Sequence, residues 1–171
     1  SLNPEMHLEK DAWLQEILSR LVGDKFVVTL SQYEYAIKVL EALGVRGCFA
    51  DILVHGRNWH TNSKLDAYEE IRKFKGLAPA EICVVGDNPR IDLLEAIEKG
   101  YRCVAISGYN PLPSINSIAT LADLPTIVQN EMSDFLDEKT LLVVSFFVTN
   151  KEALAKLRSQ WSNRNSEHSR V

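Results

Sequence analysis

The hydrophobic positions along the chain follow two alternating patterns. Some segments place apolar residues three and four positions apart, which predicts helices with one buried face. Others are short continuous runs of valine, isoleucine and leucine, which predict strands buried on both faces. Helices are expected at residues 3–22, 36–44, 66–76, 88–100, 124–136 and 150–161. Strands are expected at residues 25–31, 49–56, 81–87, 101–107 and 141–148.

A polar loop at residues 57–63 precedes the helix expected at residues 66–76. Asp66 is placed to cap that helix, and Gly76 is placed to end it. Lys64 therefore falls in the loop before the helix. The expected buried face of the helix consists of Ala67, Ile71 and Phe74.

Strands and helices alternate with short connections between them. This order predicts an α/β fold, a three-layer, doubly wound parallel sheet with helices on both faces, as in a Rossmann-type core. Ligands of such sheets bind beyond the carboxyl ends of the strands. The rule brings residues 29–31, the loop after Gly56 and residues 86–92 to one edge of the sheet.

The pattern also suggests how the 171 residues are divided. Residues 1–128 are expected to form the α/β core. Residues 129–162 read as a helix–strand–helix extension packed on that core, and residues 163–171 as a polar, frayed tail.

Composition narrows the class of protein. A net charge of -4 and a pI near 5.6 give no global attraction to nucleic acid or to an anionic membrane. Even the longest apolar run, at residues 141–148, is too short to cross a bilayer. Three widely spaced cysteines in apolar surroundings predict reduced, buried thiols in a cytoplasmic protein. The four histidines form no metal-binding pattern.

Four polar residues stand where this fold would place a ligand. Asp87 ends a buried strand and Asp92 begins the next helix, an arrangement that suits Mg²⁺ and a nearby phosphate. Thr29 and Lys64 are positioned to bind a phosphoryl group. Ordinary structural roles remain open for each of them: a turn for Asp87, a helix-dipole contact for Asp92, a strand position for Thr29 and a solvated surface charge for Lys64.

Taken together in this order, the segments resemble the haloacid dehalogenase (HAD) superfamily. The resemblance extends from about residue 11 to residue 128 and includes FVVTLS, LEALGVRGCFADILVHG, the long segment from SKLDAYEEI to YRCVAIS, and INSIATLADLPTIV. Thr29 falls on the second motif of the family, Lys64 on the third, and Asp87 and Asp92 on the fourth. The segment around Lys64 departs from the commoner Lys-Pro-x-Pro form.

The resemblance implies a phosphatase-type hydrolase that acts on a small phosphorylated metabolite. In the family, an aspartate at the tip of the first strand attacks phosphorus and forms an aspartyl-phosphate. Asp87 and Asp92 would then help to hold Mg²⁺, while Thr29 and Lys64 would bind and stabilise the phosphoryl group.

The first motif, a hydrophobic strand ending in Asp-x-Asp-x-Thr, is not in the sequence. The nearest match, DFLDEKTLL at residues 134–142, has its carboxylates three apart and its apolar run after them, so a circular permutation is not expected. Three interpretations stay open: part of a longer enzyme, a non-catalytic binding or scaffold module with a protein partner, or a nucleophile supplied by another chain. Loss of the central first strand would leave unpaired sheet edges, and the run at residues 141–148 is a candidate to fill the gap.

Overall fold

The computed structural model describes residues 12–106, 115–118, 121–134 and 141–144. The strands are β1 (Asp24–Thr29), β2 (Asp51–Val54), β3 (Ile82–Gly86), β4 (Arg102–Ile106), β5 (Asn116–Ile118) and β6 (Leu141–Val144). The helices are α2 (Ala12–Ser19), α3 (Tyr33–Ala42), α4 (Lys64–Lys75), α5 (Leu94–Lys99) and α6 (Leu124–Glu131). Short helical turns are η1 (Arg46–Cys48), η2 (Pro79–Glu81), η3 (Pro89–Leu93) and η4 (Leu121–Asp123).

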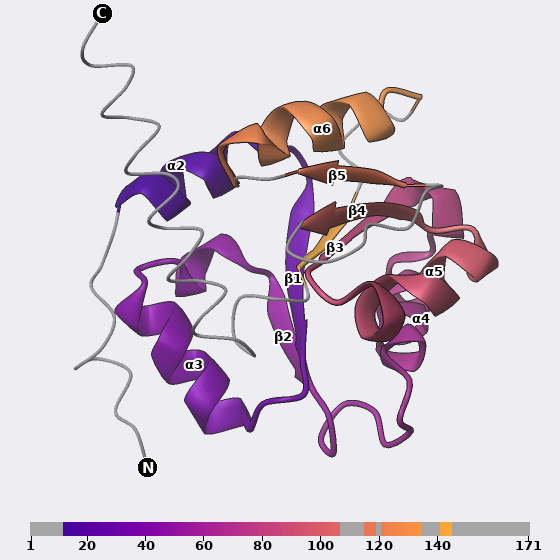
Figure 1. Cartoon of the computed structure of the whole chain (residues 1–171). Helices are drawn as coiled ribbons and strands as arrows, with labels where there is room; N and C mark the ends of the chain where they lie inside the picture. The colour runs from indigo at the N-terminus through magenta and orange to yellow at the C-terminus, as the bar shows by residue number, and fades with distance from the viewer. Residues whose placement is uncertain (1–11, 107–114, 119–120, 135–140, 145–171) are drawn as a thin grey trace, which may run out of the picture.

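The strands form one sheet in the order β2-β1-β6-β3-β4-β5, and all its pairings are parallel. Helices cover both faces, with α2, α3 and α6 on one side and α4 and α5 on the other (Figure 1). The predicted three-layer α/β fold is therefore confirmed. None of the described helices is long and apolar enough to cross a membrane.

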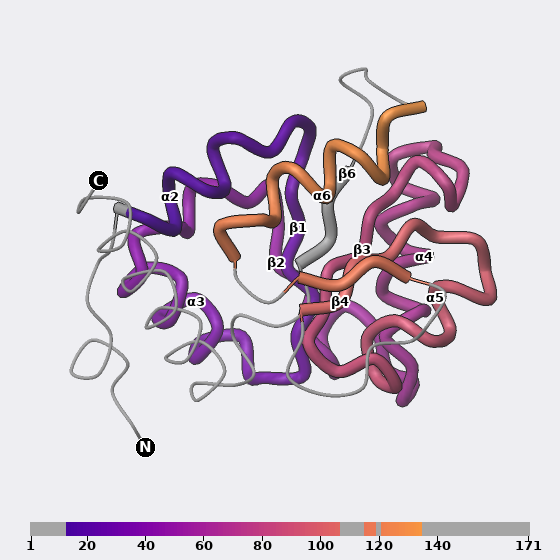
Figure 2. The backbone as a smooth tube through the Cα atoms, turned by 45° about the horizontal axis from the view of Figure 1, so that its top comes forward, coloured from indigo at the N-terminus to yellow at the C-terminus, as the bar shows by residue number. Residues whose placement is uncertain are grey.

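Each face of the sheet has its own hydrophobic core. One core joins α2 and α3 to the sheet through side chains such as Leu14, Leu40 and Val27. Figure 2 shows α6 running beside α2 over this same face. The other core packs α4 and α5 against the sheet, with Tyr68, Ile82 and Leu93 among its fully buried members. The side chains of β1 and β3 divide between the two cores, as expected for strands covered on both faces.

Strand β6, the last of the described strands along the chain, lies in the middle of the sheet. It pairs with β1 on one side and with β3 on the other, so that Val143 lies opposite both Phe26 and Val84. The gap-filling role expected of residues 141–148 is thus observed for residues 141–144, and residues 145–148 lie outside the described residues. Without β6, the facing sides of β1 and β3 would both present unpaired backbone groups.

Other expected elements differ in their limits. The expected boundary at residue 128 falls inside α6, and β6 belongs to the core sheet. Strand β5 was not expected, because only Ile118 of its three residues is buried and no apolar run marks it. The expected helix at residues 150–161 and the tail at residues 163–171 lie outside the described residues.

The start of α4 corrects three expectations. Ser63, and not Asp66, caps the helix, because the Ser63 side chain accepts a hydrogen bond from the Leu65 N–H. Lys64 is consequently the first residue of the helix and is not in the loop before it. Phe74 is 82% exposed and does not belong to the buried face.

A partly buried polar network ties α4 to the start of β4. Arg72 donates two hydrogen bonds to the Glu69 carboxylate, at 3.0 and 2.6 Å, and the Tyr101 hydroxyl donates a third at 2.5 Å. The hydrogen bonds from Arg72 hold the pKa of Glu69 at about 2, below its ordinary value of 4.5. The ionised carboxylate therefore stabilises the folded state.

We expect this contribution to disappear in acid. Because the folded-state pKa of Glu69 is depressed, its stabilisation is present above pH 4.5 and is lost as pH falls towards 2. Glu69→Gln should lower the thermal midpoint at pH 7, and the difference from the unmodified protein should narrow below pH 4.5. Thermal unfolding at several pH values measures this. Glu70→Gln makes the same charge change at an exposed neighbouring position and should not show the narrowing.

We also expect a proline in β6 to unfold the protein. Val143→Pro removes a backbone N–H from a strand that is paired on both sides, and its ring obstructs the neighbouring strand. The loss should be about 3 kcal/mol or more in the free energy of unfolding, measured by urea denaturation. Val143→Thr keeps the N–H and the β-branched shape and serves as the matched control. A Val143→Pro protein as stable as this control would contradict the central position of β6.

Candidate functional site

The four candidate residues lie around one edge of the sheet. Thr29 is the last residue of β1, and Asp87 directly follows β3. Because the strands are parallel, their carboxyl ends meet at one edge, with the end of β6 between these two. Lys64 starts α4 and Asp92 lies in η3, the turn that follows β3.

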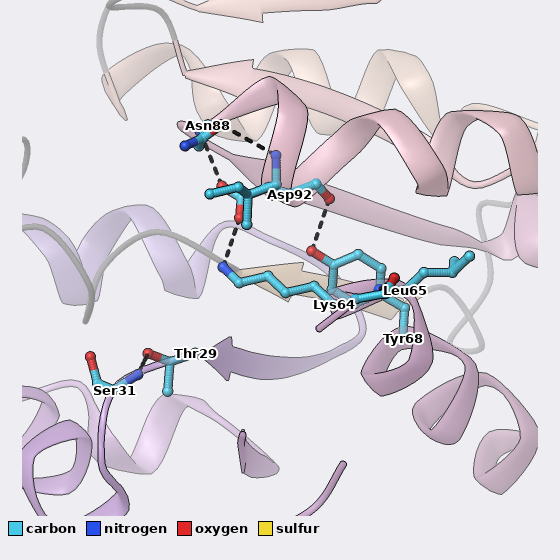
Figure 3. A network of polar contacts seen from close by, with 9 residues as sticks. Thr29, Ser31, Lys64, Leu65, Tyr68, Asn88 and Asp92 are labelled. Carbon is cyan, nitrogen blue, oxygen red and sulfur yellow. Dashed lines mark hydrogen bonds and ion pairs between the residues drawn. The ribbon is translucent and has the colours of Figure 1, made fainter. Parts of the chain in front are cut away.

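The centre of the site is a buried ion pair. The Lys64 Nζ lies 2.7 Å from the Asp92 Oδ1, and the two side chains are only 3% and 2% exposed (Figure 3). The other carboxylate oxygen, Oδ2, accepts a hydrogen bond of 3.0 Å from the backbone N–H of Asn88. Removing one member of such a pair typically costs about 3–5 kcal/mol, because the other charge is left buried and uncompensated. The pair therefore fixes the approach of α4 to the end of β3.

Tyr68 adds a second link between the same two elements. It lies one helical turn after Lys64, and its hydroxyl donates to the backbone carbonyl of Asp92 at 2.9 Å. Asp92 is thus held by its carboxylate and by its backbone at once. Sequence reasoning missed Tyr68, although its position four residues after Lys64 predicts that both side chains leave the same face of a helix.

A π-helical turn shapes the chain around Asp92. Asn88 precedes this turn, and its side chain accepts a hydrogen bond from the Ile91 N–H at 3.2 Å. The predicted start of the helix at Asn88 and Pro89 is therefore confirmed, whereas the wide first turn was not expected. Single π-helical turns are rare in proteins, and those that occur often lie at functional sites.

Gly86 brings β3 close to this turn. A Cβ atom added at Gly86 would lie 2.5 Å from the Asp92 Cβ and 2.7 Å from its Oδ2. Glycine is therefore required here for the Asp92 carboxylate to pack against the end of β3. The tight approach explains in physical terms why position 86 holds a glycine.

Asp87 is the half-buried carboxylate beside this pair. Partial burial and, after it, the negative charge of Asp92 raise its pKa to about 6, while Lys64 acts in the opposite direction. Burial and Asp92 thus disfavour the ionised form of Asp87. A cation in addition to Lys64 would be favourable near Asp87, because it would stabilise this ionised form.

Thr29 is fully buried at the end of β1. Its Oγ1 accepts a hydrogen bond of 3.0 Å from the Ser31 N–H, and its carbonyl accepts one of 3.2 Å from the His55 N–H. Among the described residues no hydrogen bond or ion pair joins Thr29 to Lys64, Asp87 or Asp92. Figure 3 shows the Thr29–Ser31 turn as a separate part of the same edge. The site consequently has two parts on either side of the end of β6.

The carboxylates present are compatible with Mg²⁺. Within the described ranges no group of three histidine, cysteine or acidic side chains could hold a metal by itself. Mg²⁺ is usually held by one or two carboxylates together with waters and substrate phosphates. Asp87 and Asp92 form such a two-carboxylate set, in which Asp92 is already engaged by Lys64 and Asn88, and Asp87 is the more exposed member.

Comparisons with known proteins place the fold. No protein-family model and no curated protein matches the chain. Among solved structures, a haloacid dehalogenase-like family hydrolase from Xanthomonas campestris matches 72% of the chain, with a TM-score of 0.59 and 13% identity. A 2-haloacid dehalogenase from Pseudomonas syringae pv. tomato DC3000 matches 68% of it, with a TM-score of 0.53 and 21% identity. The chain spans 52% of each of these structures.

We expect Gly86→Ala to disturb the site. The added methyl group would push Asp92 away, so the free energy of unfolding should fall by about 1–3 kcal/mol. Gly47→Ala is the matched control, because a Cβ there has no atom within 4 Å and the position has no positive φ. Urea denaturation of the two variants measures the difference. Equal stability of both variants would contradict the close approach of β3 to Asp92.

Proposed function

We propose that the chain, which has the fold of the HAD-like hydrolases, holds the phosphate-binding and Mg²⁺-binding part of a HAD-type phosphomonoester hydrolase site. The observation that supports this most is the buried Lys64–Asp92 pair next to Asp87 at the carboxyl edge of the sheet. A stable core does not need such a pair, since apolar residues of similar volume often stabilise as well or better.

Each residue has a role that follows from its position. Asp87 is the less buried carboxylate and would contact a metal, and Asp92 holds Lys64 through their ion pair. Lys64 would offset the negative charge of a phosphoryl group. The Thr29 hydroxyl accepts from Ser31 and keeps its own hydrogen to donate to a phosphoryl oxygen from the opposite side of β6. Mg²⁺, when bound, would supply charge neutralisation and orient the phosphate.

In the family that the chain resembles, hydrolysis through an aspartyl-phosphate uses the aspartate of an Asp-x-Asp-x-Thr motif, and the given sequence does not contain this motif. In the family that the chain resembles, the strand ending in Asp-x-Asp is central in the sheet. Here β6 occupies the centre, and the sequence after it is Ser145-Phe146-Phe147-Val148-Thr149, which contains no aspartate. These five residues lie outside the described part of the structure.

This observation favours a second candidate, a non-catalytic HAD-like binding module. With the central position filled by β6, the facing sides of β1 and β3 are both paired in the described sheet without a nucleophile strand. The module would keep the phosphate and Mg²⁺ contacts and use them to bind a ligand or a protein partner without turning the ligand over.

We expect Mg²⁺ to stabilise the chain through Asp87. At about ten times its Kd, Mg²⁺ should raise the free energy of unfolding by about 1.4 kcal/mol. Asp87→Asn should abolish this response to Mg²⁺. Without Mg²⁺, the same variant should unfold at a higher temperature than the unmodified chain, because the charge of Asp87 is disfavoured in the folded state at pH 7. Thermal unfolding with and without Mg²⁺ measures both effects.

Asp51→Asn is the matched control for charge, since Asp51 is exposed at the start of β2, on the opposite edge of the sheet. It should leave the Mg²⁺ response intact. Absence of any Mg²⁺ response in the unmodified chain would contradict both candidate functions.

Activity separates the two candidates. Mg²⁺-dependent hydrolysis of p-nitrophenyl phosphate that is lost in Asp87→Asn would reject the binding module. Binding without turnover would support it for this chain. A reading frame upstream of Ser1 that encodes a hydrophobic strand ending in Asp-x-Asp-x-Thr would support the enzyme.

A further inference from the structure

A cationic side chain lies on the rim of the site, next to the Thr29 part. Arg57 follows β2, and its guanidinium carbon lies 3.8 Å from the centre of the Tyr33 ring. Tyr33 is the first residue of α3, which follows β1 after the short turn beyond Thr29. Figure 1 shows the loops after β1 and β2 leaving the sheet together and then diverging to α3 and α4. The Arg57–Tyr33 pair spans these two loops.

The loop that contains Arg57 is held firmly. The N–H groups of Arg57 and Asn58 both donate to the carbonyl of Val54, at 3.1 and 2.9 Å. The Asn58 side chain in turn accepts from the Val54 N–H at 2.8 Å. Trp59 is buried beneath the loop and accepts a backbone hydrogen bond of 2.8 Å from Gly56. The backbone of Arg57 is therefore fixed relative to the end of β2, directly beside Thr29.

Arg57 has no carboxylate partner among the described residues. Three other arginines of the described chain form ion pairs with acids: Arg20 with Glu16, Arg72 with Glu69, and Arg102 with Asp134. Arg57 is instead exposed and held by an aromatic face, which leaves the edge of the guanidinium available for hydrogen bonds. A guanidinium in this state is suited to bind a carboxylate or a phosphate through two parallel hydrogen bonds.

The spacing of the strands limits the size of the ligand. Neighbouring strands lie about 4.8 Å apart, and β2, β1, β6 and β3 follow one another in the sheet. A phosphoryl group between Thr29 and Asp87 would lie above β6, about 10 Å from the line of β2. A ligand that joins this phosphoryl position to the Arg57 guanidinium therefore spans about two strand spacings, which corresponds to a short molecule.

We propose that the ligand of this site is a short phosphomonoester with a second anionic group, a carboxylate or a second phosphate, that binds to Arg57. The inference rests on the proposed function, because it assumes that the first phosphate binds between Thr29 and Asp87. The proposed molecule is the substrate if the chain is part of an enzyme, and the bound ligand if the chain is a binding module.

Three probes test the proposal by isothermal titration calorimetry in the presence of Mg²⁺. Ethyl phosphate has one anion, phosphoglycolate adds a carboxylate, and ethylene glycol bisphosphate adds a phosphate. We expect the full chain to bind at least one of the two-anion probes about tenfold more tightly than ethyl phosphate, and the tighter of the two identifies the second anion. The Arg57→Gln variant should bind the two-anion probes and ethyl phosphate with about equal affinity. Its affinity for ethyl phosphate should equal that of the unmodified chain.

Arg46→Gln is the matched control. It removes the same charge from η1, which precedes β2 and so lies at the opposite edge of the sheet, and it should keep the tenfold preference. Tyr33→Leu removes the supporting ring and should weaken the preference while Arg57 is still present.

The outcomes separate this inference from the proposed function. If all three probes bind with equal affinity, or if Arg57→Gln keeps the preference, the Arg57 subsite is overturned and the phosphate site stands. If no probe binds, the proposed phosphate site itself is overturned, and the subsite with it.

Discussion

The buried ion pair between Lys64 and Asp92 is the interaction on which the candidate site depends. It joins the first residue of α4 to the turn after β3, and Tyr68 repeats the connection one helical turn later. Lys64 would be expensive to bury alone, and Asp92 equally so, so that each requires the other. The close approach at Gly86 is part of the same constraint, because the Asp92 carboxylate occupies the space that a side chain there would need.

The sheet provides the second constraint, since it decides which residues share an edge. Thr29 and Asp87 are far apart in sequence and come from strands that do not pair with each other. They lie near each other at one edge because β6 pairs with both β1 and β3. A strand that follows both residues in the sequence therefore determines the distance between the two parts of the candidate site.

Much of this could be predicted from the sequence, and the failures have physical causes. The continuous apolar runs predicted four of the strands and the parallel sheet, and the run at residues 141–148 predicted a strand to fill the central gap. Strand β5 was missed because a three-residue edge strand has almost no pattern. Asp66 was mistaken for the helix cap because aspartate and serine are equally good in that role, and only the hydrogen bond from Leu65 identifies Ser63. The helix therefore begins about one turn earlier than the sequence predicts, and this places Lys64 inside the helix, where it is buried. The spacing of apolar residues does not reveal a buried lysine.

The sequence predicts Asp87 and Asp92 as metal ligands and Thr29 and Lys64 as phosphate-binding residues, and the surroundings of the four distinguish them further. Asp92 has both oxygens engaged by Lys64 and Asn88, so it orients its neighbours more readily than it binds a metal. Asp87 keeps a raised pKa because partial burial and the charge of Asp92 outweigh the nearby lysine. A cation placed at Asp87 would relieve that imbalance, whereas one placed at Asp92 would have to compete with Lys64. The electrostatics therefore support the proposal that Asp87 contacts a metal and that Lys64, which is bound to Asp92, meets the phosphate.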